Sequence, residues 1–367
     1  MEIKIDPRII KSISEFNLPT KIGFGKTLAP VMISCSYKEE KWGALNLVPY
    51  EPLTLSPTAK VFHYGQEIFE GMKAYRVNGQ GPYLFRPEEN QKRFNLSAER
   101  MAMPTLPEEL FINSVKLLTE YCAPFIPDKS GDSLYLRPFM FATEEHLGIA
   151  PSNEFKFMVV ASPSTAYFSS DSLKVLIERE YVRAVDGGTG QAKTGGNYAG
   201  GLNSAIRAKN LGFSQTLWLD SKKREVVEEM SGMNIFVVMK GKLVTPSLEK
   251  TILDGVTRRC LIRLAEDMGF SIEERALSIN ELIEAIQSGE CSEAFACGTA
   301  VIVTPIEGFG EDDGTFYKVR SKGESIWPRL REKLLALQEG REKDIYGWRH
   351  KVSLSYGEKA SEGGVEV

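Results

Sequence analysis

The chain has 367 residues, a length that accommodates two domains of ordinary size. Hydrophobic residues make up 42% and charged residues 26% of it, which is the balance of a globular protein with a sizeable core. Its 45 basic and 49 acidic residues are interspersed and leave a net charge of −4. This balance argues against a nucleic-acid-binding protein and against a basic membrane-surface patch.

The cysteines and histidines are too few and too scattered to support a metal site. The cysteine count of five is odd, and no pair shows C-x-x-C spacing, so we expect reduced thiols and a cytoplasmic protein. The three histidines lie far apart, which disfavours both metal binding and a histidine-centred triad. We also expect no targeting peptide and no membrane span, because no apolar run reaches the ~18 residues that a span requires.

The first half of the chain alternates short strands and helices. Val61–Phe69 is aromatic-rich and predicts a strand, which Gly71–Tyr75 continues as extended chain. Pro87–Met101 predicts a helix that opens with proline. Ser133–Thr143 and the nearly continuous apolar run Phe155–Ser162 predict two further strands. We assign residues 1–162 to an N-terminal α/β domain.

A cluster of proline, threonine and serine at 163–172 predicts an interdomain loop, and residues 173–367 are expected to form the C-terminal domain. The polar tail around Gly363 and Gly364 is expected to be disordered. The fold class is therefore mixed α/β (α+β) in two domains, with no prediction of strand order. The second domain is predicted to contain a strand, a glycine-dense segment, a helix, a hairpin and another helix, at 173–180, 187–201, 202–210, 234–245 and 254–268.

The most informative stretch is the glycine-dense segment around Lys193, Asp-Gly-Gly-Thr-Gly-Gln-Ala-Lys-Thr-Gly-Gly-Asn-Tyr. A Walker A loop is excluded because Ala192 stands where a glycine is required, and a dinucleotide fingerprint would need a glycine at Lys193 itself. Gly23–Thr27 fails as a Walker A loop because Thr20 occupies the first glycine position. The remaining interpretations are a flexible surface loop with a solvated lysine and a loop whose small residues admit a planar ligand.

The Lys193 segment resembles the Schiff-base lysine segment of the branched-chain amino-acid aminotransferases, which are fold type IV pyridoxal 5'-phosphate enzymes. Further matches run in order from about Phe24 to Ala300 and are jointly specific. One departure is visible: some family members have a C-x-x-C pair after the Gly-Thr-Ala turn, whereas Ala300–Thr304 contains no cysteine. The matching segments are His63-Tyr64, Phe69–Lys73, Phe85-Arg86-Pro87 with Arg93, Tyr135–Pro138, Glu228–Asn234, Gly255–Thr257 and Gly298–Ala300.

The resemblance implies roles for three groups around the cofactor ring. Lys193 would be the catalytic residue, because one amine can both attach to the cofactor's aldehyde and shuttle the proton. Tyr198 resembles the phenol that hydrogen-bonds the cofactor's O3′. Glu229 resembles the carboxylate that pairs with the pyridine nitrogen, although an error of one residue would place that role on Glu228.

A second implied group binds the cofactor's phosphate. Arg93 would offer a guanidinium fork, and Thr299 a hydroxyl. Val256 and Thr257 would offer backbone amides at the N-terminus of the predicted 254–268 helix, where the dipole suits an anion. Asp254 could instead cap those amides itself.

A third implied group recognises the substrate. Phe24, Tyr64, Phe69 and Tyr135 resemble the aromatic lining of a pocket for aliphatic side chains. Arg137 would orient Tyr64 or help bind the substrate carboxylate, and the Thr299-Ala300 amides would assist. Leu147 and Ile149 resemble the loop that crosses a homodimer interface into the partner's site. Each of these side chains, taken singly, is more often plain core or surface.

The activity implied by the resemblance is a reversible ping-pong transamination from leucine, isoleucine or valine to 2-oxoglutarate, with no metal, membrane or nucleic acid. A D-amino-acid aminotransferase or an aminodeoxychorismate lyase would share the lysine segment but match less well at Tyr135–Pro138 and Glu229–Asn234. A non-catalytic dimer that binds a phosphorylated ligand is a second alternative. A nucleotide-binding protein is a remote third.

Overall fold

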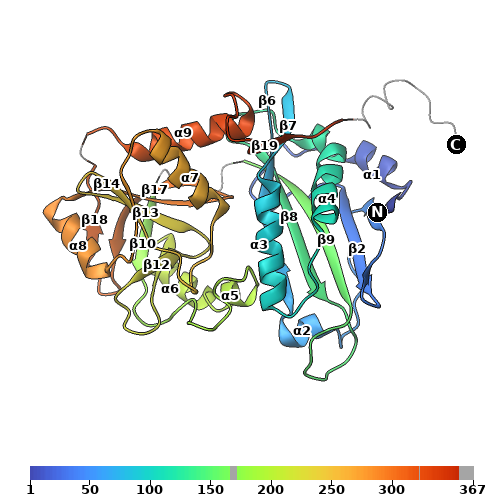
Figure 1. Cartoon of the computed structure of the whole chain (residues 1–367), viewed down its shortest axis with the longest axis horizontal. Coiled ribbons are helices and arrows are strands. Elements are labelled where there is room, and N and C mark those ends of the chain that lie inside the picture. Colours follow the sequence, from blue (N-terminus) through green and yellow to red (C-terminus); the bar gives the residue numbers. More distant parts are fainter. Residues whose placement is uncertain (166–171, 322, 355–367) are drawn as a thin grey trace. The chain divides into compact units, whose positions relative to one another are not determined.

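The computed structural model describes residues 1–165, 172–321 and 323–354. These residues divide into two compact units (Figure 1). The first unit holds the described residues up to Thr165 together with those from Leu335 onward, and the second holds those between. Each unit contains a mixed sheet with helices packed on it, so the predicted mixed α/β class is confirmed.

The predicted domain limits need two corrections. Residues 335–354 belong to the first unit rather than the C-terminal one, because β19 (Arg349–Lys351) pairs with β7 (Gln80–Phe85) and completes its edge of the first sheet. The predicted loop at 163–172 is also too long at its start, because β9 continues to Ser164. The rest of that loop from residue 166 to 171, and the tail around Gly363 and Gly364, lie outside the described residues.

In the described residues of the first unit, ten strands form one sheet in the order β1-β4-β2-β9-β8-β6-β7-β19, with β3 on β2 and β5 on β8. The longest pairing joins β8 and β9 in antiparallel register from Ser133↔Ser164 to Ala142↔Phe155. The remaining strands are β1 Ile3–Ile5, β2 Val31–Lys38, β3 Lys41–Trp42, β4 Leu45–Pro49, β5 Glu67–Phe69, β6 Met72–Val77, β8 Ser133–Ala142 and β9 Phe155–Ser164.

Helices α3 (Pro87–Arg100) and α4 (Glu108–Tyr121) pack side by side against this sheet (Figure 1). Proline at the first helical position suits α3, because its missing amide would have no intrahelical partner there. Asn90, Arg93, Phe94 and Ser97 recur at helical spacing and are buried, so α3 turns Arg93 inward. The other helices of this unit are α1 Ile9–Glu15, α2 Lys60–Tyr64 and the 3₁₀ turn η1 Ala123–Phe125.

The prediction of a strand over Val61–Phe69 is wrong in its first half. Residues 60–64 form α2, which ends at Gly65 in the left-handed conformation (φ 58°), a common helix stop. Only Glu67–Phe69 forms a strand, and it pairs with β8. Aromatic residues favour strands, but tertiary pairing decides the outcome here.

In the described residues of the second unit, nine strands form one sheet in the order β12-β11-β10-β17-β16-β13-β14-β15, with β18 on β17. The predicted hairpin is confirmed: β13 and β14 pair antiparallel and turn at Gly241, which has φ 75°. The strands are β10 Leu173–Ile177, β11 Gln215–Leu219, β12 Val227–Met230, β13 Asn234–Met239, β14 Lys242–Thr245, β15 Ile272–Glu274, β16 Cys291–Gly298, β17 Ile302–Gly310 and β18 Phe316–Lys318.

Helix α8 (Ile279–Ser288) packs against β16 and closes the core of the second unit. Ser278 caps its start by accepting a hydrogen bond from the Asn280 amide, and Gly289 ends it at φ 74°. The predicted helices at 202–210 and 254–268 are present as α6 and α7. The other helices are α5 Gly196–Ala199, α6 Leu202–Asn210, α7 Val256–Asp267 and α9 Ile326–Glu339, of which α9 continues into the first unit from Leu335.

No helix within the described ranges is both long and apolar enough to cross a membrane. Among the same residues, no three histidine, cysteine, aspartate or glutamate side chains gather as metal ligands would.

Candidate active site

Lys193 lies on the loop that precedes α5, and that loop is held by its own hydrogen bonds. The Asn197 side chain donates to the carbonyls of Thr189 and Ala192, both at 2.8 Å, and accepts from the Thr189 hydroxyl at 2.7 Å. The half-buried Lys193 ammonium donates to the Tyr198 hydroxyl oxygen at 2.8 Å. Because its backbone is fixed and its amine is paired with a phenol, the flexible-loop interpretation of this segment does not hold.

One glycine of this segment is required by close packing. A Cβ at Gly190 would lie 2.7 Å from the Ala184 Cβ and 2.9 Å from the Thr251 Cα, distances that side chains cannot adopt without a backbone shift. Gly190 therefore lets the lysine loop lie directly against the segment at Thr251.

Glu229 on β12 is a buried carboxylate held by three groups. Its Oε1 lies 2.9 Å from Arg183 Nε, and its Oε2 accepts from the Asn234 amide nitrogen at 3.2 Å and the Leu253 backbone amide at 3.3 Å. Burial raises the pKa of Glu229 to about 7, while the charges of Arg183 and Lys193 act in the opposite direction. The carboxylate is thus poised between its charged and neutral forms near neutral pH.

Glu228, its neighbour on the same strand, has different partners. Successive strand residues point to opposite faces, and the Glu228 carboxylate accepts a hydrogen bond from the Thr251 hydroxyl at 2.6 Å. Burial raises the pKa of Glu228 as well, while the Thr251 hydrogen bond and the Arg183 charge act in the opposite direction. The two neighbouring carboxylates therefore have different partners, and the assignment of the ring-nitrogen role to Glu229 stays a prediction.

The sequence analysis did not identify Arg183 as a partner of Glu229. The two residues are far apart in the chain, and no local spacing connects them; a lone arginine after a strand carries no signal. Asn234 lay inside a matching segment but received no role. A buried carboxylate such as Glu229 needs a cation and further hydrogen-bond donors. This rule predicts that partners exist, but it does not say which residues supply them.

The predicted phosphate-binding residues of the second unit lie at two turns. Gly255 is the N-cap of α7 and has no side chain to bond its amides, and first-turn amides have no partner inside a helix. The Asp254 carboxylate lies 3.4 Å from Arg259 Nε. Thr299 and Ala300 lie in the turn between β16 and β17.

Arg93, the predicted phosphate ligand of the first unit, forms a buried ion pair with Glu70. Arg93 Nε lies 2.7 Å from Glu70 Oε1, and Arg93 Nη2 donates to Oε2 at 2.9 Å. Asn90 donates to the same Oε2 at 2.8 Å. The pairing explains why Glu70 is tolerated with its surface wholly buried, and it was not foreseen from the sequence.

Four of the predicted substrate residues form one cluster in the first unit. The Phe24 and Tyr135 rings meet edge to face with centroids 4.8 Å apart. Arg137 lies over the Phe69 ring at 4.8 Å and donates to the Tyr135 hydroxyl at 3.1 Å. A Cβ at Gly71 would lie 2.1 Å from that hydroxyl, so glycine is what allows Tyr135 its position.

Tyr64 is not part of this cluster's hydrogen bonding. Its hydroxyl donates to the Leu147 carbonyl, whereas the Arg137 guanidinium bonds to Tyr135. Arg137 is thus bonded to Tyr135 in this structure, and its expected role toward Tyr64 or the substrate carboxylate stays a prediction. Leu147 and Ile149 are 58% and 90% exposed.

All five cysteines are buried, and none of them forms a disulfide. Burial raises the pKa of the Cys35 thiol to about 11 and that of Cys291 to about 12, so the reactive thiolate is disfavoured there.

Comparison with known proteins matches this chain to one family. The model of the family described as amino-transferase class IV matches residues 67–309. The chain is 41% identical over 355 residues to a probable branched-chain-amino-acid aminotransferase of Staphylococcus epidermidis, covering 96% of this chain and 98% of the relative. It is 44% identical over 339 residues to the branched-chain-amino-acid aminotransferase of Mycolicibacterium smegmatis, covering 90% and 92%.

A solved structure of a T.th. branched-chain amino acid aminotransferase, complexed with N-(5'-phosphopyridoxyl)-L-glutamate, superimposes with a TM-score of 0.70 at 27% identity. The match covers 91% of this chain and 100% of that one. The predicted fold type IV architecture is thereby confirmed. With relatives matched over nearly their full length, the chain belongs to the class IV amino-transferases and, within them, to the branched-chain amino-acid aminotransferases.

Proposed function

We propose that this protein is a pyridoxal 5'-phosphate enzyme that transfers the amino group of leucine, isoleucine or valine reversibly to 2-oxoglutarate in a ping-pong cycle. The observation that carries the proposal is the pairing of the Lys193 amine with the Tyr198 phenol, in the unit that also buries Glu229 with Arg183. An amine, a phenol and a poised carboxylate are the groups that such chemistry requires.

The residues present fit this cofactor. Lys193 would attach to its aldehyde, Tyr198 would hydrogen-bond its ring oxygen, and Glu229 would pair with its ring nitrogen. The first-turn amides of α7 at Val256 and Thr257, with the Thr299 hydroxyl, suit the phosphate, because amides and a helix dipole favour an anion. When bound, the cofactor supplies an electron sink for the bond that breaks at the substrate Cα.

The protein's own groups then divide the work. The Lys193 amine would take the proton from the substrate Cα and pass it to the adjoining carbon, as general base and then general acid. Tyr198 holds that amine in place through its hydroxyl. Arg183 and Asn234 fix the Glu229 carboxylate, so the charge that stabilises the ring is oriented before the reaction begins.

For substrate recognition we assign the cluster of Phe24, Phe69 and Tyr135, together with Tyr64, to the aliphatic side chain. Complete burial of such a side chain is worth about 1.5–3 kcal/mol. Glutamate brings a second carboxylate, which cannot be buried without partners. The Tyr135 hydroxyl and the Arg137 guanidinium, already bonded to each other, are the polar groups proposed to meet it or the α-carboxylate, with the Ala300 amide assisting. Arg93 would add its charge to phosphate binding while paired with Glu70.

We further propose a cytoplasmic homodimer. The exposed Leu147 and Ile149 side chains support an interface at their loop, because large apolar side chains at a protein surface gain from being covered. The five cysteines, none of which forms a disulfide, support a reducing compartment.

The proposal is tested by the visible spectrum of the purified holoenzyme and its change on adding amino acids. L-valine and L-leucine should bleach the band of the lysine-bound cofactor, and 2-oxoglutarate should restore it. D-alanine and aminodeoxychorismate serve as comparators for the related activities. A response to either comparator instead of L-valine would reassign the enzyme within the fold, and no cofactor band at all would favour a non-catalytic binding protein.

A further inference from the structure

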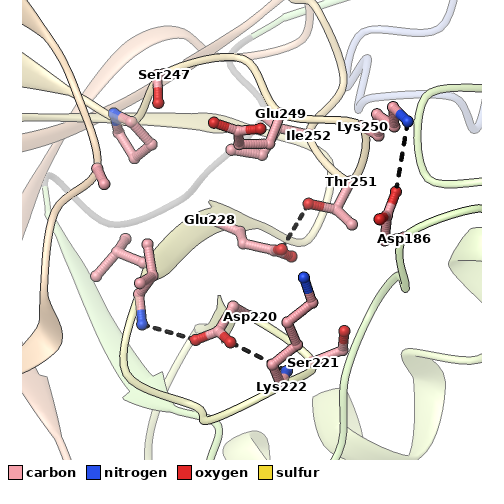
Figure 2. A pocket seen from close by; sticks show the side chains of 14 residues that line it. Asp186, Asp220, Ser221, Lys222, Glu228, Ser247, Glu249, Lys250, Thr251 and Ile252 are labelled. Atoms are coloured by element: carbon pink, nitrogen blue, oxygen red, sulfur yellow. Dashed lines mark hydrogen bonds and ion pairs between the residues drawn. The ribbon is translucent and has the colours of Figure 1, made fainter.

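The second unit contains a cavity of about 370 Å³ whose lining includes Glu228 of β12 (Figure 2). One wall is apolar and includes Val227, Pro246, Ile252 and Ala276. The rest of the lining is polar or charged and includes Glu228 and the exposed Lys222 and Lys250. This volume is ample for a small molecule with a short aliphatic chain.

Glu228 is the buried charge of this cavity. Its side chain lies at the centre of the lining residues in Figure 2, and the residue is only 5% exposed. Oε1 accepts the Thr251 hydroxyl at 2.6 Å, whereas Oε2 is buried and has no hydrogen-bond partner among the described residues. A buried carboxylate oxygen without a donor is costly, and the structure supplies none for it.

The other carboxylates of the cavity are already engaged or exposed. Asp220 accepts four backbone amides at 2.8–3.0 Å, which hold its pKa down to about 2 despite partial burial. Asp186 lies 4.0 Å from Lys250, and Glu249 is exposed to solvent. Of the buried polar groups that line the cavity, Glu228 is thus the one with an oxygen that has no hydrogen-bond partner in the described residues. Lys222 and Lys250, which also line the cavity, are exposed.

We propose that this cavity is an effector site for a small aliphatic primary amine, whose ammonium group donates to Glu228 and whose alkyl chain lies on the apolar wall. An ammonium ion provides three donors and the opposite charge. A neutral alcohol of the same shape offers only one donor and no charge. The apolar wall selects a short branched or straight chain over a fully hydrated cation such as a metal ion.

The site is connected to the proposed catalytic carboxylate by direct contacts. Thr251 donates to Glu228 through its hydroxyl, and the Thr251 carbonyl accepts from Arg183 Nη2. Arg183 in turn pairs with Glu229. A ligand that fixes Glu228 and Thr251 therefore acts on Arg183, the residue that orients Glu229. Only this last step, from Arg183 to catalysis, rests on the proposed function.

Binding is measured on the holoenzyme reduced with borohydride, in which the cofactor is locked onto the protein and cannot react with an added amine. Isobutylammonium chloride is the probe, and the reporter is the Ile252 methyl signal in protein labelled at isoleucine methyls. We expect a saturable shift at Ile252 with little change at Ile283, which does not line the cavity. Glu228→Gln should weaken binding about tenfold or more, whereas the exposed neighbour Glu225→Gln should bind as the wild type does. Isobutanol should bind at least tenfold more weakly than the amine.

Equal affinities of the wild type and Glu228→Gln, or equal affinities for amine and alcohol, would overturn the site and indicate a water or a proton at Glu228 instead. Turnover of leucine by the unreduced enzyme tests the effector role: isobutylammonium should change kcat in Glu225→Gln and not in Glu228→Gln. Binding at Ile252 with identical kcat responses in both would overturn the effector role. Failure of leucine turnover altogether would refute the proposed function while leaving the binding result intact.

Discussion

The two units each bury an arginine–glutamate pair, and the pairs differ in how completely they are satisfied. In the first unit, Glu70 receives two bonds from Arg93 at 2.7 and 2.9 Å and a third from Asn90 at 2.8 Å. In the second, Glu229 has a single 2.9 Å approach from Arg183 and longer bonds of 3.2 and 3.3 Å from Asn234 and Leu253.

This difference separates a pair that holds structure from one that can change charge. A bidentate fork with short bonds strongly favours the ionised carboxylate. The looser set around Glu229 leaves burial as the dominant influence on its pKa, which lies near 7. The second arrangement would suit the proposed role of Glu229 as the partner of the cofactor's ring nitrogen.

The largest expected effect on activity comes from removing the amine of Lys193, which lies in the same unit as the Arg183–Glu229 pair. Lys193→Ala should reduce transamination by about 10³-fold or more, because attachment and proton transfer are lost together. The fold should persist, as judged by circular dichroism. Lys209→Ala, which removes an exposed lysine on α6, is the control and should retain activity. Substantial turnover by Lys193→Ala would show that another group is the base.

Replacing the arginine of each pair tests whether the two pairs contribute differently to the free energy of unfolding. Arg93→Met should lower the free energy of unfolding by about 3–5 kcal/mol, because a buried carboxylate loses both bonds of its fork. Arg183→Met should cost less, about 1–3 kcal/mol, because Glu229 can take up a proton and keep its other partners. Urea unfolding of the cofactor-free protein measures both. Equal losses would mean that the two pairs are energetically alike.

The pH dependence of stability tests whether Glu229 changes its charge near neutral pH. Folding raises the pKa of Glu229 from 4.5 to about 7, so the protonated carboxyl favours the folded state. Its contribution is fully present below pH 4.5 and is lost as the pH rises through about 7. In the cofactor-free protein, the melting temperature of the wild type should therefore fall relative to that of Glu229→Gln over this interval. Parallel curves would contradict the raised pKa.

A smaller effect is expected from the aromatic cluster. Tyr135→Phe removes the hydroxyl that accepts from Arg137 and should impair the glutamate half-reaction several-fold more than the leucine half-reaction, because only glutamate needs a polar partner for a second carboxylate. Single-turnover spectra with each amino acid separate the two. Equal losses would place Tyr135 at the end of the site common to both substrates.

Elements with a local sequence signal could be predicted from the sequence. Pro87 marks the start of α3, Gly241 the hairpin turn, and the lysine loop has its own composition. The strand predicted at Val61 failed because aromatic content does not distinguish a strand from a short helix ended by Gly65.

What could not be predicted are contacts between distant segments. The partnership of Arg183 with Glu229 and that of Glu70 with Arg93 depend on how strands and helices pack, which no spacing in the chain encodes. The return of Arg349–Lys351 to the first sheet is of the same kind, because a three-residue edge strand has almost no sequence signature.

The central claim is that Glu229, and not its neighbour Glu228, works with Lys193. It is tested most directly by the rate of the leucine half-reaction under single-turnover conditions in the two isosteric variants, each saturated with cofactor. Glu229→Gln should be slowed by about 10²-fold or more, with a smaller change in cofactor affinity, because the carboxylate stabilises charge mainly in the transition state. Glu228→Gln should stay within a few-fold of the wild type. A severe defect in Glu228→Gln with a mild one in Glu229→Gln would contradict the account.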